Sequence, residues 1–132
     1  MALQYLLDTH VVIRWMSEPA RLSKEQARVL HQSLGRGEAI AVSALSILEI
    51  AMWERSSRKT MGSVENLLVE IETNPVFHVL PITVPIALDA AALIELRDSA
   101  DRTIVATARI HRLRLLTSDQ RIIESRLVAV VD

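Results

Sequence analysis

Four acidic residues stand where short apolar segments of this sequence begin or end, namely Asp8, Glu49, Asp101 and Asp119. If the fold brings them together, like charges raise one another's pKa, and at about 4 Å each repulsion amounts to several kcal/mol. The sequence shows no obvious Lys or Arg inside the cluster, so a hard divalent cation would best relieve the repulsion. Such a site suits phosphoryl transfer, in which a metal polarises a phosphate oxygen and activates water. The pattern therefore predicts one or two bound divalent cations.

Each acid also has a purely structural interpretation. Asp8 and Asp101 stand where helix caps are expected, and a helix N-terminus stabilises any carboxylate. Asp119 fits a turn in the segment 117–120, and Glu49 fits an exposed helix position. The metal-site hypothesis therefore depends on the joint pattern and not on any single acid.

Short apolar runs alternate with amphipathic segments along the chain. Strands are expected at 3–7, 39–42, 76–80, 115–117 and 127–131. Helices are expected at 10–16, 23–34, 43–53, 63–71 and 83–96, and from 101 onward. Thr9 is expected to cap the first helix, and Ser23 with Gln26 forms a capping-box pattern for the second. The alternation predicts a three-layer α/β/α fold with a parallel sheet of four to five strands, in a single domain over 1–132.

The expected elements place the acids at one edge of the sheet. Ligands of open parallel sheets bind beyond the carboxyl ends of the strands. Asp8 and Asp119 follow expected strands, Asp101 stands at a helix start, and Glu49 lies about one turn inside the helix after the second strand. All four side chains are therefore expected to converge.

Composition narrows the class of protein. The chain has 132 residues, and half of them are hydrophobic, which is enough for one aliphatic core. It has no cysteine, which excludes disulfides and thiolate metal sites and is compatible with a reducing cytoplasm. The sequence shows neither a membrane-spanning apolar run nor a signal-peptide pattern. The net charge of −1 provides no global basic field for nucleic acid, so RNA contact would depend on local basic clusters at 55–59 and 109–114, which are equally compatible with solvated helix faces.

At these residues the sequence resembles the PIN domain and, more closely, the VapC toxins of bacterial type II toxin–antitoxin pairs. The segments that carry the resemblance are 6–10, 43–51, 80–83, 97–108 and 116–119. The family commonly has Asp-Pro before its third acid, whereas here Ser99 follows Asp98. This departure makes the loop less rigid but removes no ligand. Asp98 is expected to bond within the loop, with a contribution to the site as the alternative.

The resemblance implies an endoribonuclease that needs Mg²⁺ or Mn²⁺ and cleaves RNA, such as tRNA or ribosomal RNA. It assigns the metal to Asp8, Glu49, Asp101 and Asp119, and supporting hydroxyl groups to Thr9, Thr117 and Ser118. It further implies a cognate VapB-like antitoxin and a homodimer, whose interface could involve Ile47, Met52, Trp53 and the pair Leu67-Leu68. Candidate RNA contacts are Arg55, Arg102 and Arg112, with His111 as a further candidate for phosphate contact. No histidine is needed as a base, and His10 is the one exception considered.

Two other functions stay open at this point. One is a catalytically silent PIN-like binding module, whose acids are structural or are occupied by a partner's basic side chain. The other is a different metal-dependent phosphohydrolase, such as a haloacid-dehalogenase-like phosphatase. That class requires a second Asp two residues after the first, where this chain has His10. We expect a cytoplasmic protein that is not inserted in a membrane.

Overall fold

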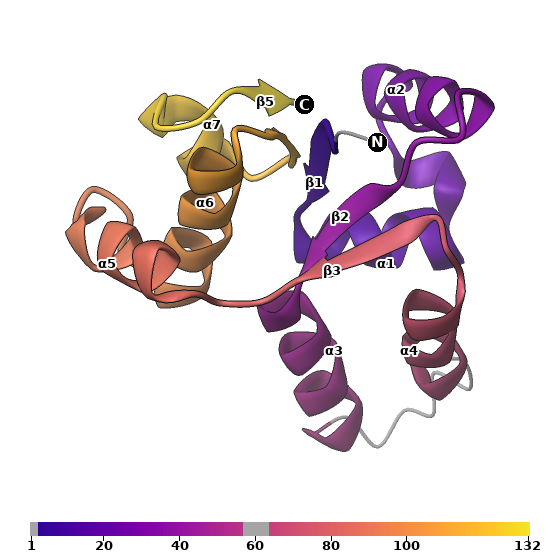
Figure 1. The fold of residues 1–132 in the computed structure, drawn as a ribbon, viewed down its shortest axis with the longest axis horizontal. Coiled ribbons are helices and arrows are strands. Elements are labelled where there is room, and N and C mark those ends of the chain that lie inside the picture. Colours follow the sequence, from indigo (N-terminus) through magenta and orange to yellow (C-terminus); the bar gives the residue numbers. More distant parts are fainter. Residues whose placement is uncertain (1–2, 57–63) are drawn as a thin grey trace.

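The computed structural model describes residues 3–56 and 64–132, and in this part of the chain it shows a five-stranded sheet (Figure 1). The strands are β1 Tyr5–Leu7, β2 Ile40–Ser43, β3 Phe77–Leu80, β4 Arg114–Leu116 and β5 Val130–Val131. They lie in the order β3-β2-β1-β4-β5, and every pair is parallel. The predicted parallel α/β fold is confirmed.

Helices connect the strands. They are α1 Thr9–Ser17, α2 Lys24–Gly35, α3 Ala44–Ser56, α4 Val64–Thr73, α5 Val84–Ala92, α6 Ser99–His111 and α7 Gln120–Ser125, with a short 3₁₀ turn, η1, at Pro19–Arg21. Helix α1 ends just before Pro19, because proline disfavours helical geometry in the residue that precedes it. The predicted capping box opens α2: the Gln26 N–H donates to Ser23 Oγ at 3.0 Å, and the Ser23 N–H donates to Gln26 Oε1 at 3.3 Å.

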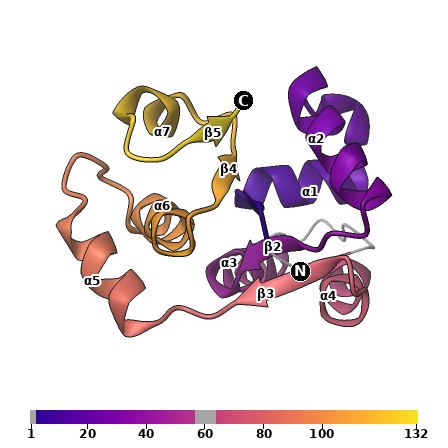
Figure 2. The same cartoon turned by 45° about the horizontal axis from the view of Figure 1, so that its top comes forward.

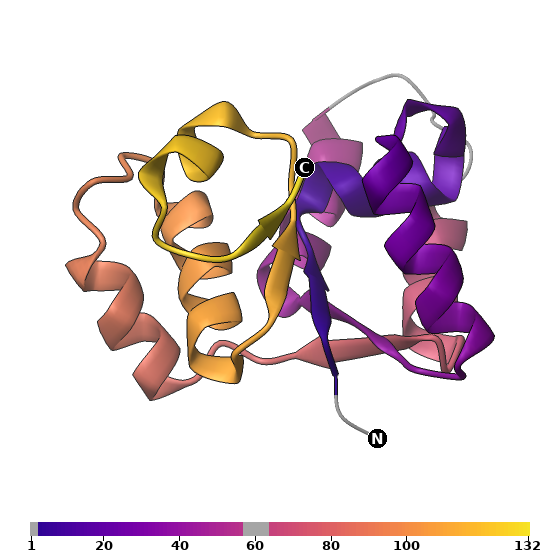
Figure 3. The same cartoon turned by 90° about the horizontal axis from the view of Figure 1, so that it is seen from above.

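Side chains alternate along the strands and build one apolar core on each face of the sheet. Leu6 and Leu115 pack with buried residues of α5, α6 and α7. Leu7 and Leu116 pack on the other face with buried residues of α1 to α4. Figure 3 shows α5, α6 and α7 on one side of the sheet and α1 and α2 on the other, and Figure 2 shows α5 beside α6. This arrangement gives the three expected layers.

Strand β1 is the centre of the sheet and the point where the strand order reverses. β2 and β3 lie on one side of it, and β4 and β5 lie on the other. Beyond β1, the Asp8 N–H donates to the Leu116 carbonyl of β4 at 2.9 Å. A ligand crevice is expected beyond the carboxyl ends of two such strands, so β1 and β4 determine where the site lies.

Several predicted boundaries were wrong, each for a local reason. Asp8 and not Thr9 is the N-cap of α1. Helix α6 begins at Ser99, before the expected start, because Asp98 caps it. Helix α5 ends at Ala92, and a turn then buries Leu93 and Leu96 in the core. The last strand covers only Val130–Val131.

Among the described residues, none of the helices has both the length and the apolar character needed to cross a bilayer.

Candidate metal centre

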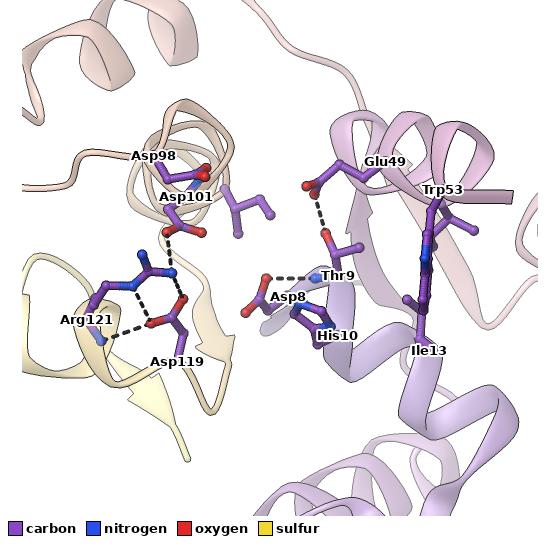
Figure 4. Close-up of a pocket in the computed structure, with 12 residues that line it drawn as sticks. Asp8, Thr9, His10, Ile13, Glu49, Trp53, Asp98, Asp101, Asp119 and Arg121 are labelled. Carbon is purple, nitrogen blue, oxygen red and sulfur yellow. Dashed lines mark hydrogen bonds and ion pairs between the residues drawn. The ribbon is translucent and has the colours of Figure 1, made fainter. Parts of the chain in front are cut away.

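A pocket of about 370 Å³ opens beyond the carboxyl ends of β1 and β4, and all four predicted acids line it (Figure 4). Asp8 directly follows β1, and Asp119 follows β4 after two further residues. Glu49 reaches the pocket from α3, and Asp101 reaches it from the first turn of α6. The structure therefore brings together acids that lie far apart in the sequence, from Asp8 near its start to Asp119 near its end.

Asp8 is the most deeply buried of these acids, with 6% of its surface exposed. Its Oδ1 accepts a hydrogen bond from the Thr9 N–H at 2.8 Å, and its Oδ2 accepts one from the Thr117 hydroxyl at 2.7 Å. Burial raises the pKa of Asp8, and these two hydrogen bonds, followed by the charge of His10, offset part of the rise. Asp8 thus caps α1 and also faces the pocket, so the structural and the metal interpretations are compatible.

Glu49 is held by a chain of hydroxyl groups between α1 and α3. The Thr9 hydroxyl lies 2.7 Å from Glu49 Oε1, to which it donates its only proton. Ser46 Oγ, 2.8 Å from the Thr9 oxygen, is therefore the donor in that second contact. Sequence reasoning missed Ser46. The available signal was its position three residues before Glu49, on the same face of one helix.

Asp98 and Asp101 share the N-terminus of α6. Asp98 Oδ1 accepts hydrogen bonds from the N–H groups of Ala100 at 2.8 Å and Asp101 at 3.1 Å, so Asp98 bonds within the loop. Burial, followed by the charges of Asp98, Asp119 and Asp8, raises the pKa of Asp101 to about 6. This rise is the electrostatic effect expected when carboxylates cluster.

Asp119 has a cationic partner that sequence reasoning missed. The Arg121 Nη2 atom lies 3.3 Å from Asp119 Oδ2 and 3.8 Å from Asp101 Oδ2 (Figure 4). Burial acts to raise the pKa of Asp119, but hydrogen bonds from the Arg121 side chain and backbone and the Arg121 charge outweigh it, so the pKa is lowered. The expectation of a cluster without an internal Lys or Arg was therefore wrong, although Arg121 stands only two residues after the last acid.

The two hydroxyl residues next to Asp119 have different positions. Buried Thr117 donates to Asp8 and accepts from the Asp119 N–H at 3.1 Å, so it links two of the acids. Ser118 instead accepts a hydrogen bond from Gln26 Nε2 at 3.2 Å and does not line the pocket.

The candidate RNA-binding arginines do not line this pocket where the structure describes them. The Arg102 Nε atom donates to the Leu96 carbonyl in the connection between α5 and α6. Arg112 is the C-cap of α6, at the end of the helix opposite Asp101. The side chain of Arg55 lies outside the described residues. Among the histidines, His10 lines the pocket, whereas His111 lies in the last turn of α6.

An apolar wall completes the pocket. It consists of Ile13, Ile50, Trp53 and Ile104. Trp53 is 45% exposed and flanks the opening beside Ile13 (Figure 4). The pocket therefore combines charged oxygen atoms on one side with an exposed aromatic ring on the other.

The residues present fit a hard divalent cation, because carboxylate oxygens dominate the donor set and no thiol competes. Within residues 3–56 and 64–132, however, no three Asp, Glu or His side chains stand close enough to share one ion. Hydrogen bonds hold the carboxylates in these positions: Thr9 holds Glu49, Thr117 holds Asp8, and Arg121 holds Asp119. Binding one shared cation therefore requires some of these carboxylates to move closer together.

Comparison with known proteins identifies the class. The PIN domain family matches residues 5–126. The chain is also 33% identical over 124 residues to Ribonuclease VapC22 of Mycobacterium tuberculosis, covering 89% of this chain and 88% of that protein. The chain therefore belongs to the PIN domain family, and the family predicted from the sequence is confirmed.

Solved structures agree with this assignment. FitAcB from Neisseria gonorrhoeae superposes with a TM-score of 0.67 at 28% identity, covering 98% of this chain and 97% of that one. VapBC2 from Rickettsia felis, solved with a DNA fragment from its promoter, superposes with a TM-score of 0.75 over 98% of this chain and 97% of that one. At 12% identity the second likeness concerns the fold alone. Within the PIN family, this chain is thus similar to the VapC ribonucleases.

Proposed function

We propose that this protein is a VapC-like, metal-dependent endoribonuclease and the toxin of a toxin–antitoxin pair. The observation that carries the proposal is the meeting of Asp8, Glu49, Asp101 and Asp119 in one pocket at the reversal of strand order. The identity of 33% to a named ribonuclease supports the same activity. RNA is the proposed substrate, with tRNA and ribosomal RNA as the candidates that the resemblance implies.

We further propose that Mg²⁺ or Mn²⁺ is the cofactor. Asp8, Glu49 and Asp101 would hold the first ion, while Asp119 would bind it through water or help to hold a second. When bound, such an ion polarises the phosphate and lowers the pKa of water for an in-line attack. The oxygen-rich donor set of the pocket supports this choice of metal.

The chain's own contribution is to hold charged oxygens in place before a ligand arrives. Thr117 and the Thr9 N–H fix the two oxygens of Asp8, while the Thr9 hydroxyl fixes Glu49. Asp8 and Asp101 also lie at the N-termini of α1 and α6, whose dipoles favour negative charge. With a pKa of about 6, Asp101 is about nine-tenths ionised at pH 7. The charge of the site therefore favours cation binding at neutral pH.

The direct test is RNA cleavage by purified, partner-free protein with Mn²⁺ or Mg²⁺. We expect Asp8→Asn and Asp101→Asn to reduce cleavage by at least about 100-fold, since each removes a charged ligand. Asn is itself a good N-cap, so Asp8→Asn should leave the start of α1 intact. Asp89→Asn is the matched control, because Asp89 pairs with Arg109 at 3.0 Å, outside the pocket. Equal cleavage by wild type and both site variants would contradict the nuclease proposal.

We propose a VapB-like antitoxin as the protein partner. The Rickettsia felis neighbour is itself a VapBC2 assembly, and the acidic pocket here is suited to a basic side chain from a partner. A catalytically silent binding module would bind such a partner and yet cleave no RNA. The same assay, run without the partner, therefore separates the two functions.

A homodimer is proposed on the basis of exposed apolar residues of α3. Met52 is 62% exposed and Leu48 is 53% exposed, whereas Trp53 lines the acidic pocket and Leu67, at 7% exposure, belongs to the core. Light scattering should report a dimer for the wild type and a monomer for Met52→Glu. A wild-type monomer would contradict the proposal. The cytoplasmic location expected from the sequence stays a prediction.

A further inference from the structure

Arg121 places a positive charge inside the pocket proposed for a metal. Its Nη2 atom lies 3.3 Å from Asp119 Oδ2 and 3.8 Å from Asp101 Oδ2, and its Nε donates to Asp119 Oδ1 at 3.4 Å. A single guanidinium group therefore joins carboxylates from α6 and from the start of α7.

The four predicted acids of the pocket, which Asp98 also lines, fall into two pairs by the charge of their partners. Asp8 and Glu49 accept hydrogen bonds from neutral donors, the hydroxyl groups of Thr117 and Thr9. Asp101 and Asp119 are paired with the cationic Arg121. Neutral hydroxyl groups can keep their contacts when a cation binds nearby. A guanidinium group cannot do so without cost, because it repels a divalent cation at short range.

The side chain of Arg121 is 73% exposed, and exposed ion pairs add little to stability, so its displacement should cost little free energy. Arg121 lines both the acidic pocket and a neighbouring pocket of about 180 Å³, whose walls include Glu95 and Asp98. Displacement toward that second pocket would keep the guanidinium near negative charge.

We propose that Arg121 is an internal counter-ion, which holds Asp101 and Asp119 when no metal is present and competes with the divalent cation for them. This inference rests on the proposed function, because it concerns the same metal site. It assigns Arg121 to metal affinity rather than to the bond-breaking step. Removing its charge should tighten metal binding, whereas removing a ligand should weaken it.

The test measures Mn²⁺ affinity of the full chain by calorimetry or by the EPR signal of free Mn²⁺. Arg121→Gln should bind Mn²⁺ about three- to tenfold more tightly than wild type, because one exposed charge is lost and water screens it heavily. Arg121→Lys keeps the charge and should bind like wild type. The control is Arg36→Gln, which removes one positive charge from the C-cap of α2, on an exposed residue that precedes β2 at the amino end of the sheet.

The outcomes distinguish this inference from the proposed function. Unchanged or weaker binding by Arg121→Gln would overturn the counter-ion role, and so would an equal gain from Arg36→Gln. In either case the nuclease proposal stands if wild type binds Mn²⁺ and Asp8→Asn does not. If Asp8→Asn binds as wild type does, the proposed metal site itself is wrong. The gain from Arg121→Gln should also shrink as salt is added.

Discussion

The two ends of the sheet carry opposite charges. Beyond the carboxyl ends of β1 and β4 lie Asp8, Asp101 and Asp119. At the amino ends of β4 and β5 an open pocket of about 450 Å³ is lined by Arg109, Arg112 and Arg114. Helix α6 runs between the two ends, with Asp101 in its first turn and Arg112 at its C-cap, which is the distribution that the helix dipole favours.

The two ends also differ in the partners that their charged side chains have. At the basic end, Arg109 pairs with Asp89 at 3.0 Å and donates to the Leu127 carbonyl at 3.1 Å, and Arg114 donates to the Val130 carbonyl at 3.4 Å. At the acidic end, burial raises the pKa of both Asp8 and Asp101. Raised pKa values therefore distinguish the acidic end, where Arg121 pairs with only part of the clustered charge. The net charge of −1 for the whole chain does not reveal this local cluster.

The largest expected effect comes from neutralising one charge at each end of α6. Asp101→Asn should reduce RNA cleavage by at least about 100-fold, because a metal ligand is lost. Arg112→Gln should change cleavage less than about twofold, since Arg112 lies in the other pocket. Cleavage rates at saturating Mn²⁺ check both values. A larger loss from Arg112→Gln would restore Arg112 as the RNA contact suggested by the sequence.

The next effect concerns Thr117 and Ser118, to which the resemblance gives the same supporting role at the site. Thr117→Val leaves Asp8 Oδ2 without its buried donor, and we expect a loss of about 1–3 kcal/mol in unfolding free energy. Metal affinity should fall by about 10- to 100-fold, as for other groups that orient a ligand. Ser118→Ala is the control and should cost less than about 0.5 kcal/mol, because Ser118 is exposed. Urea unfolding and Mn²⁺ titration measure both variants, and equal losses would disprove the distinction.

A smaller effect is the pH dependence of stability without metal. The folded-state pKa of Asp101, about 6, exceeds its ordinary value of 3.8, so the folded chain binds more protons between these pH values than the unfolded chain does. Unfolding free energy should therefore fall as pH rises from about 4 to about 6, by about 1–2 kcal/mol after solvent screening. The lowered pKa of Asp119 changes the unfolding free energy only at lower pH, where that carboxylate becomes protonated.

Thermal melts across this pH range, with and without Asp101→Asn, measure the effect. The variant should have a smaller slope, because it no longer titrates at this position and only the raised pKa of Asp8 still acts in the same direction. Saturating Mn²⁺ should restore stability at pH 7, since the ion binds the ionised carboxylates of the folded chain. A wild-type melting temperature that rises steadily from pH 4 to pH 6 would contradict the raised pKa.

The smallest expected effect tests the aromatic wall, which also distinguishes the two ends. Trp53 lines the acidic pocket, whereas no aromatic residue lines the basic one. A nucleobase stacked on Trp53 would contribute about 1 kcal/mol to RNA binding. Trp53→Ala should therefore raise KM about fivefold and leave Mn²⁺ affinity unchanged, whereas Trp53→Phe should keep most of the binding. Unchanged KM in the alanine variant would exclude stacking.

Local patterns in the sequence were enough to predict the elements and the candidate acids. Apolar runs indicated each strand, and Ser23 with Gln26 indicated the start of α2, because strand alternation and helix caps depend on nearby residues. Asp8 and Asp119 were predicted at strand ends for the same reason. The joint pattern of acids, together with the resemblance, then sufficed to predict the PIN family.

Only the tertiary structure decided which side chains touch. The strand order places β1 beside β4, and as a result Thr117 reaches Asp8 across 109 residues of sequence. The same packing turns Arg121 into the pocket and leaves Arg112 at the far end of α6. Such contacts depend on how distant elements pack and which rotamers that packing allows. For this reason sequence spacing identified the acids, and the resemblance added Thr9 and Thr117, but both missed Ser46 and Arg121.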